Sequence, residues 1–71
     1  MQEIAKQFGR NLHVARWEAG ITQGDLADLV FIDRGALSRL EQGHRLPRLD
    51  LVVRLAEAIG VQVRDLLYGI G

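Results

Sequence analysis

Residues Asp33–Gly43 read DRGALSRLEQG, a pattern that predicts one short helix with two contrasting faces. At 3.6 residues per turn, one face is apolar and is expected to be buried: Ala36, Leu37 and Leu40. The opposite face lacks the Lys and Glu pairs of an ordinary solvated helix and carries small or hydrogen-bonding residues instead: Gly35, Ser38, Arg39 and Gln42. Asp33 is a suitable N-cap, and Gly43 stands where a left-handed residue would end the helix. We therefore expect the outer face to contact another molecule.

The composition of the whole chain excludes several classes of protein. Its 71 residues are interpreted as one small domain, residues 1–71, which buries only about 60% of its unfolded surface. The absence of cysteine excludes a disulfide framework and a thiolate metal site. His13 and His44 have no metal-ligand spacing and are interpreted as chance surface residues, so no metal or other cofactor is expected. No apolar run suits a signal peptide or a membrane span, and we expect a cytoplasmic protein.

Charge is distributed unevenly along the sequence. The formal net charge is zero, yet residues 34–48 contain four arginines and one glutamate, a net charge of +3. The rest of the chain therefore carries −3. A basic segment that coincides with the outer face of the 33–43 helix indicates an anionic partner.

A first helix is expected over about residues 3–19. The spacing of four apolar residues predicts its buried stripe: Ile4, Phe8, Leu12 and Ala15. Gly9 interrupts the helix at a cost of about 1 kcal/mol relative to Ala, which weakens the first two turns. Trp17 lies off the stripe. Partial burial of Trp17 against a neighbouring loop is the favoured interpretation, and a contact surface is the alternative.

A second helix follows almost directly and leads into the 33–43 segment. Thr22 to Asp25 has the form of a capping box, and the helix is expected to run to about Val30. Three apolar residues form its buried face: Leu26, Ala27 and Val30. Only Phe31 and Ile32 separate it from Asp33, so the two short helices must cross steeply, as in a helix-turn-helix.

The C-terminal third is expected to complete the core. After a basic loop, a helix is expected over Leu49–Ile59. Its polar residues form a single stripe, Asp50, Arg54 and Glu57. Because the rest of its surface is apolar, this helix is expected to be buried on most sides and to lie at the centre of the core. A last short helix is expected over residues 63–68. The sequence therefore predicts a compact all-α fold of five helices.

With these motifs in place, the chain resembles the Cro and phage-repressor type of helix-turn-helix domain, the XRE family, over about residues 8–67. The resemblance rests on the spacing of short motifs taken together: Gly20-Ile-Thr-Gln23, Leu26-Ala27, Leu37-Ser-Arg-Leu-Glu41, Gly43, Pro47, Leu55-Ala56, Gly60-Val61 and Leu66-Leu67. It implies a lambda-repressor-like fold with the third helix, about residues 33–42, in the major groove of double-stranded DNA. It also implies a transcription regulator, commonly a repressor that binds as a homodimer.

The resemblance assigns candidate DNA-binding residues whose chemistry suits the role. An arginine can make a bidentate contact to guanine, and cations beside the helix can hold phosphates. Gln23 lies in the first turn of the second helix, where free N–H groups favour a phosphate. The full candidate set is Thr22, Gln23, Arg34, Gly35, Ser38, Arg39, Gln42, His44, Arg45 and Arg48. The family also implies a structural ion pair between Arg16 and Glu41, so Glu41 is not interpreted as catalytic.

Three residues depart from the family pattern. Phe31 occupies a turn position that is often Gly, which predicts a wider or differently twisted turn. Asp33 replaces a common Ser and places negative charge near the expected path of the phosphates. Gly35 replaces a base-reading side chain. These departures affect the expected sequence preference more than DNA binding itself.

Two function hypotheses remain open from the sequence. The first is a sequence-specific DNA-binding regulator that forms a homodimer through its apolar C-terminal segment: Leu67, Tyr68 and Ile70. The second is a protein-interaction module of the same fold that has lost DNA binding, suggested by the zero net charge and by Asp33, Gly35 and Trp17. The basic segment favours the first. No nucleophile–base pair, metal spacing or phosphate-cradling loop in the sequence indicates an enzyme or a small-molecule substrate.

Overall fold

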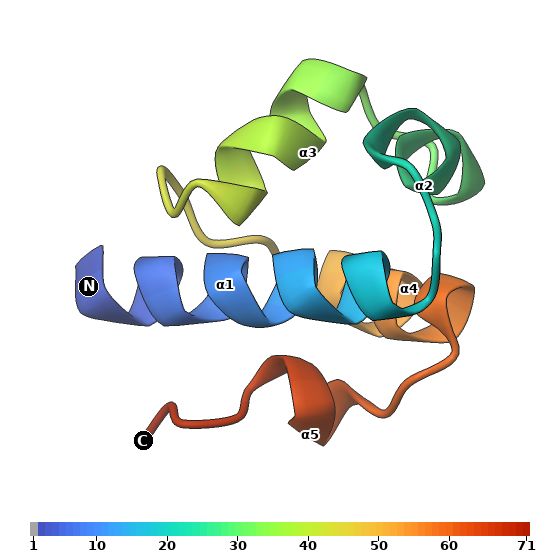
Figure 1. The fold of residues 1–71 in the computed structure, drawn as a ribbon. Coiled ribbons are helices and arrows are strands. Elements are labelled where there is room, and N and C mark those ends of the chain that lie inside the picture. The colour runs from blue at the N-terminus through green and yellow to red at the C-terminus, as the bar shows by residue number, and fades with distance from the viewer. Residues whose placement is uncertain (1) are drawn as a thin grey trace.

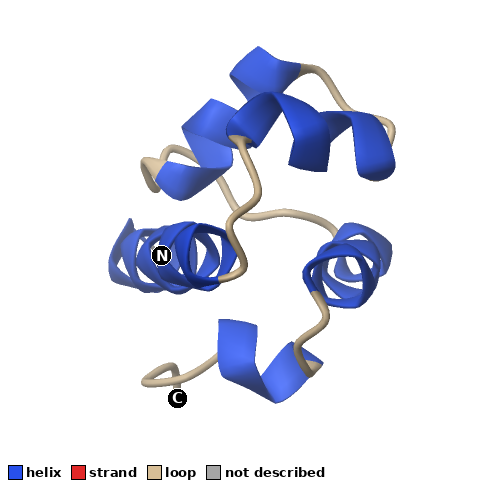
Figure 2. Cartoon of the chain, turned by 45° about the vertical axis from the view of Figure 1, so that its right-hand side comes forward, coloured by secondary structure: helices blue, strands red, loops and turns tan. Residues whose placement is uncertain are grey.

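The computed structural model describes residues 2–71 and contains five helices, which confirms the expected fold class. Their bounds are α1 Gln2–Glu18, α2 Gln23–Leu29, α3 Arg34–Glu41, α4 Leu49–Ile59 and α5 Val63–Leu66. In Figure 1, α2 and α3 lie above α1, and α5 lies beneath it. Figure 2 shows α1 and α4 nearly end-on in the middle layer, between the α2–α3 pair and α5. The fold therefore presents α3 on one side of the molecule and α5 on the other.

The core draws side chains from all five helices. Phe8 and Leu12 of α1 are 1% and 0% exposed, and they meet a set of buried apolar residues from the other elements: Leu26, Ala27, Val30, Leu37, Leu40, Val52, Leu55, Ala56, Ile59 and Leu66. Burial of each large side chain contributes about 1.5–3 kcal/mol relative to exposure. Because α3 contributes Leu37 and Leu40 to this core, its orientation is fixed and its opposite face is held outward. No helix within residues 2–71 combines the length and apolar sequence needed to cross a membrane.

Burial differs from expectation at several apolar positions. Ile4 was expected in the core but is 40% exposed, and Ala5 is buried instead. The expected partial burial of Trp17 is wrong, because its side chain is 72% exposed. The prediction that α4 is buried on most sides is also wrong, since Leu49 and Val53 face solvent. A domain this small has too few elements to cover every apolar face of a helix.

Local hydrogen bonds set the ends of the helices that frame the turn. Thr22 Oγ1 accepts the backbone N–H of Asp25 at 3.1 Å and caps α2, while Asp33 Oδ2 accepts the N–H of Gly35 at 2.9 Å and caps α3. Gly43 ends α3 with a positive φ of 78°. The expected N-caps and the glycine stop are therefore confirmed.

The α2–α3 turn is a regular helix stop with an unusual residue in it. Phe31 adopts φ = 61°, and its N–H donates to Asp28 while the N–H of Ile32 donates to Ala27. This pair of hydrogen bonds is the Schellman arrangement, whose left-handed position is normally Gly. Phe31 thus takes the conformation that Gly would take, so the turn is closed by the usual hydrogen bonds and the expectation of a wider turn is wrong. Its side chain is 88% exposed.

We predict that Phe31→Gly stabilises the fold. A left-handed conformation costs a residue with Cβ about 1–2 kcal/mol, and an exposed ring contributes little packing to offset that cost. The greater backbone entropy of Gly in the unfolded chain reduces the net gain to about 1 kcal/mol. Denaturant unfolding of Phe31→Gly and Phe31→Ala measures the effect, since Ala keeps the Cβ. Equal stability of the two variants would show that the turn is not strained.

Candidate nucleic-acid interface

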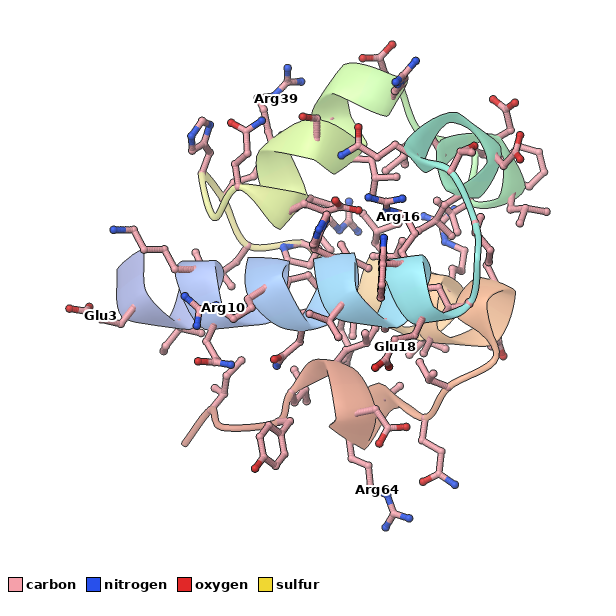
Figure 3. The ribbon with its side chains drawn as sticks, viewed as in Figure 1. Glu3, Arg10, Arg16, Glu18, Arg39 and Arg64 are labelled. Carbon is pink, nitrogen blue, oxygen red and sulfur yellow. The ribbon has the colours of Figure 1, made fainter. Side chains whose placement is uncertain are left out.

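The outer face of α3 exposes the polar residues expected there. Arg34, Arg39 and Gln42 are exposed, while Gly35 and Ser38 are half-buried. Figure 3 shows the Arg39 side chain projecting from α3 away from α1. The described residues offer Arg39 neither a salt bridge nor a side-chain hydrogen bond, so its guanidinium is free to bind a partner.

Gly35 provides room beside the Arg39 guanidinium. A Cβ built at Gly35 would lie 3.4 Å from Arg39 Nη1 and 2.9 Å from Asp33 Oδ2. The Arg39 side chain therefore runs back along α3 toward its N-terminus, as long helical side chains commonly do. Because Gly35 has no side chain, nothing at position 35 projects over the N-terminal part of the α3 surface. The Arg39 guanidinium beside it is therefore accessible.

Ser38 and Gln42 form a pair one helical turn apart. Gln42 Nε2 donates to Ser38 Oγ at 2.9 Å. The hydroxyl hydrogen of Ser38 and the remaining groups of the Gln42 amide are left for an external partner. The pair therefore presents fixed donors and an acceptor next to Arg39.

The loop after α3 extends the positive surface. His44, Arg45 and Arg48 are all exposed, and the Arg48 side chain is 92% exposed. Arg48 Nε lies 3.7 Å from Asp50 Oδ1, a long contact at a solvated position that contributes little. The four arginines of residues 34–48 thus all reach solvent.

The start of α2 is organised differently from expectation. The Thr22 side chain is occupied as the N-cap, and Gln23 Nε2 donates to Glu41 Oε1 at 3.1 Å. The Gln23 amide is therefore tied to the end of α3 instead of standing free in the first turn. This tether was not predicted, because it joins residues 18 positions apart.

Glu41 is the centre of a hydrogen-bonded cluster that joins α1, α2 and α3. Arg16 Nε lies 2.6 Å from Glu41 Oε2, and the two side chains are only 11% and 4% exposed. Arg16 also donates through Nη2 to Glu41 Oε1 at 3.2 Å and through Nη1 to the Ile21 carbonyl at 2.8 Å. The ion pair implied by the family resemblance is thus present, and it fixes α3 to α1.

His13 lies on the surface as expected, with its side chain 54% exposed, but it also contacts this cluster. Its Nδ1 lies 3.0 Å from Glu41 Oε1 and 3.3 Å from Arg16 Nη2. Its place three residues before Arg16, on the same side of α1, is the one sequence signal that could have indicated this. His44 lies in the loop and is exposed, as expected.

The environment of Glu41 favours its charged form. Burial raises the pKa of Glu41, but hydrogen bonds from Arg16, His13 and Gln23 and the positive charge of Arg16 outweigh burial, so its pKa lies below the ordinary value of 4.5. The Glu41 carboxylate is ionised, hydrogen-bonded and largely shielded from solvent, with its side chain 4% exposed. Its contacts are those of a structural residue.

The surface as a whole suits a polyanion. Helix α3 exposes Arg34 and Arg39, and the following loop exposes Arg45 and Arg48, so one side of the molecule carries hydrogen-bond donors and positive charge. Among the described residues, no three His, Cys, Asp or Glu side chains gather as a metal site. The arrangement is suited to binding an anionic surface.

Comparison with known proteins agrees with this geometry. A family model described as a helix-turn-helix domain matches residues 7–67. The restriction-modification controller protein C.AhdI from Aeromonas hydrophila is 32% identical, with a TM-score of 0.83 over 87% of this chain and 94% of that one. The clp gene regulator ClgR from Corynebacterium glutamicum is 30% identical, with a TM-score of 0.88 over 90% of this chain and 68% of that one.

A third similar structure is the hypothetical transcription factor NHTF from Neisseria. It is 25% identical, with a TM-score of 0.84 over 94% of this chain and 78% of that one. A search of curated proteins found no match.

Proposed function

The chain belongs to the helix-turn-helix domain family, and we propose that it is a sequence-specific DNA-binding transcription repressor that acts as a homodimer. The observation that carries the proposal is the outer face of α3, where free arginines project from a helix whose other face is locked into the core. An α-helix fits the major groove of B-DNA, where each base pair presents a distinct pattern of donors and acceptors. The similar structures are those of a controller protein, a gene regulator and a hypothetical transcription factor, which supports regulation over catalysis.

Reading of the base sequence is assigned to α3. Arg39 is long, free and unshielded at Gly35, so it suits a bidentate contact to guanine O6 and N7. Arg34 lies at the start of α3 and can reach either a base or a phosphate. The Ser38–Gln42 pair supplies further base contacts whose geometry is set by their mutual hydrogen bond.

We assign contacts with the phosphates of the DNA backbone to residues beside α3. His44, Arg45 and Arg48 lie in the loop that follows the helix, where cations contact phosphates and position the domain without reading sequence. Thr22 and Gln23 contribute from the start of α2, with the Gln23 amide oriented by Glu41. Repression follows where a domain bound in this way occupies a promoter.

We predict that Arg39 and Arg45 respond differently to truncation. Arg39→Ala should lose about 1–3 kcal/mol on the preferred site and relax discrimination at one base pair per half-site. Arg45→Ala should weaken preferred and scrambled DNA alike and lower the salt slope by about one unit, as should Arg48→Ala. The preferred site is first obtained by selection from a random DNA pool, and binding is then measured across a salt series.

Arg64→Ala is the matched control for these variants. Arg64 is an exposed arginine of α5, on the side of the molecule opposite α3, so its removal changes the net charge equally without touching the proposed interface (Figure 3). Equal weakening of both DNAs by Arg39→Ala would make Arg39 a phosphate contact. If the selection enriched no sequence and the protein bound no DNA at low salt, the alternative of a protein-interaction module would replace the proposal.

Self-association is proposed through the C-terminal segment. Leu67 and Tyr68 are 40% and 77% exposed, and Asn11 Nδ2 holds this segment to α1 by donating to the carbonyls of Leu66 at 2.9 Å and Tyr68 at 2.8 Å. Ile70 packs against the core, so it is not available as the sequence suggested. We therefore assign the contact to Leu67 and Tyr68.

We predict that Tyr68→Ser weakens the homodimer. Sedimentation of the free protein and of its complex with a two-fold site measures the mass, and the variant should bind that site with less cooperativity. Trp17→Ser is the control, because Trp17 is a similarly exposed aromatic residue outside the proposed contact. One protein molecule per two-fold site for the unmodified chain would contradict the dimer.

A further inference from the structure

A cavity of about 220 Å³ lies behind α3, between this helix, the loop that follows it and α4. Its apolar wall includes Ile32, Leu40 and Leu51, and Leu40 is only 2% exposed, so the wall is continuous with the core. An occupant that displaces water from such a wall needs an apolar part.

The rim of the cavity is cationic. Arg45, Arg48 and Arg54 line it together with a single carboxylate, Asp50, which leaves a net charge of +2. Asp50 lies 3.7 Å from Arg48 Nε and 3.9 Å from Arg54 Nη2, both long contacts, and Arg45 forms no salt bridge or side-chain hydrogen bond with any described residue. The rim therefore has unneutralised charge for an anionic group.

One rim arginine is held in place before any ligand arrives. Arg54 Nη1 donates to the Val30 carbonyl at 2.7 Å, which links α4 to the end of α2 and fixes the guanidinium beside the cavity. A guanidinium that is already oriented loses less rotamer entropy when it binds a carboxylate. Arg54 is thus a fixed contact at the rim, and Arg45 adds a guanidinium that no described side chain pairs with.

We propose that this cavity binds a small carboxylate with an apolar group, of the size of an aromatic or branched-chain acid. The volume of about 220 Å³ lies below the range of about 300–1,000 Å³ that is typical for drug-sized ligands, which favours a small occupant. The apolar group lies against Ile32, Leu40 and Leu51, and the carboxylate meets Arg45 and Arg54. Nothing in the proposed DNA contacts uses this apolar wall.

Occupancy of the cavity is expected to weaken DNA binding, an expectation that rests on the proposed function. A carboxylate that engages Arg45 competes with the phosphate contact assigned to the same side chain, and the cavity wall includes the inner side of α3. Coupling between two ligands is reciprocal, so DNA must weaken binding of the acid by the same factor. The protein would then be a regulator that responds to a small acid.

The test uses benzoate as the probe and amide chemical shifts of the whole chain as the readout, without DNA. We expect saturable shifts at Ile32, Leu51 and Arg54 with a millimolar Kd, the range for a ligand of about nine non-hydrogen atoms. Benzamide, which lacks the charge, and inorganic phosphate, which lacks the apolar group, should each bind at least about tenfold more weakly. Arg45→Gln should weaken benzoate about fivefold or more, and Arg64→Gln should leave it unchanged.

Each result decides the proposal. Shifts scattered over the surface, or equal shifts with benzamide, would overturn the site. Equal shifts with phosphate would make it a contact for the DNA backbone. Benzoate binding that survives Arg45→Gln would overturn the assigned rim. Because these measurements contain no DNA, a failure of the DNA-binding proposal leaves them valid, and the coupling is tested separately by DNA binding at saturating benzoate.

Discussion

Arg16→Met should unfold or nearly unfold the protein, with an expected loss of about 3–5 kcal/mol, the usual cost of removing one partner of a buried ion pair. Met keeps an unbranched side chain in place of the apolar stem of Arg16, so the loss of charge and hydrogen bonds dominates. The Glu41 side chain is only 4% exposed, and the substitution removes its 2.6 Å contact with Arg16 Nε. A loss of this size is a large fraction of the stability of a small domain.

The loss should lie in the upper part of this range because Arg16 also holds a loop. Its Nη1 donates to the Ile21 carbonyl at 2.8 Å and so holds the segment between α1 and α2. His13 and Gln23 remain as partners of Glu41, but neither can replace the bidentate contact of a guanidinium. The α1, α2 and α3 junction therefore depends on one arginine.

A double-mutant cycle separates the pair from the rest of the site. Removing both charges with Arg16→Met and Glu41→Leu leaves no unpaired buried charge, so the double variant should be more stable than Arg16→Met alone. Thermal or denaturant unfolding of the four proteins gives the coupling energy. A loss below about 1 kcal/mol for Arg16→Met, the value of an exposed pair, would show that solvent screens the contact.

The same contact gives stability a defined pH dependence. The pKa of Glu41 is lower in the folded state than its ordinary value of 4.5, so the unfolded chain takes up a proton first as the pH falls. The Glu41 contribution is therefore complete above the ordinary pKa and is lost as the pH falls through the folded pKa. Glu41→Gln should be less stable near neutral pH and should show a smaller loss on acidification.

Several features that depend on residues close together in the sequence were predicted correctly, whereas two contacts between distant segments were not. The bounds of α4 were predicted to the residue, because Pro47 and Gly60 flank one uninterrupted helical period. The residues on the outer face of α3 were also predicted, because the helical period of residues 33–43 alone decides which side chains share that face. The tether of Gln23 and the contact of His13 with Glu41 were not, because both depend on how α1 and α2 cross the end of α3.

The exposed apolar residues show the other limit of sequence reasoning. The sequence pattern predicted partial burial of Trp17 and burial of the 49–59 helix on most sides, yet Trp17, Leu49 and Val53 are exposed. An apolar period says which residues share a face, but burial also requires a second element against that face. In a chain of 71 residues such elements are few.

Gly9→Ala should destabilise the fold by about 3 kcal/mol, the upper part of the range for overpacked cores. Helix propensity alone gives the opposite sign, since Ala is favoured over Gly by about 1 kcal/mol inside a helix. The structure decides the sign: a Cβ at Gly9 would lie 2.5 Å from the Leu40 carbonyl oxygen and 2.6 Å from that of Glu41. Both are backbone atoms and cannot rotate away, so α3 would have to move.

Gly9, which the sequence presents as a weak point of α1, therefore lies where the backbone of α3 packs closely against α1. Moving α3 away from Gly9 would also lengthen the Arg16–Glu41 contact, so the two effects should not be additive. Gly24→Ala is the matched control, because Gly24 lies within α2 with nothing within 4 Å of its added Cβ, and it should stabilise by up to about 1 kcal/mol. Denaturant unfolding of both variants tests the opposed signs. A Gly9→Ala protein as stable as the unmodified chain would show that α1 and α3 can separate without cost, so that this contact does not fix the position of α3.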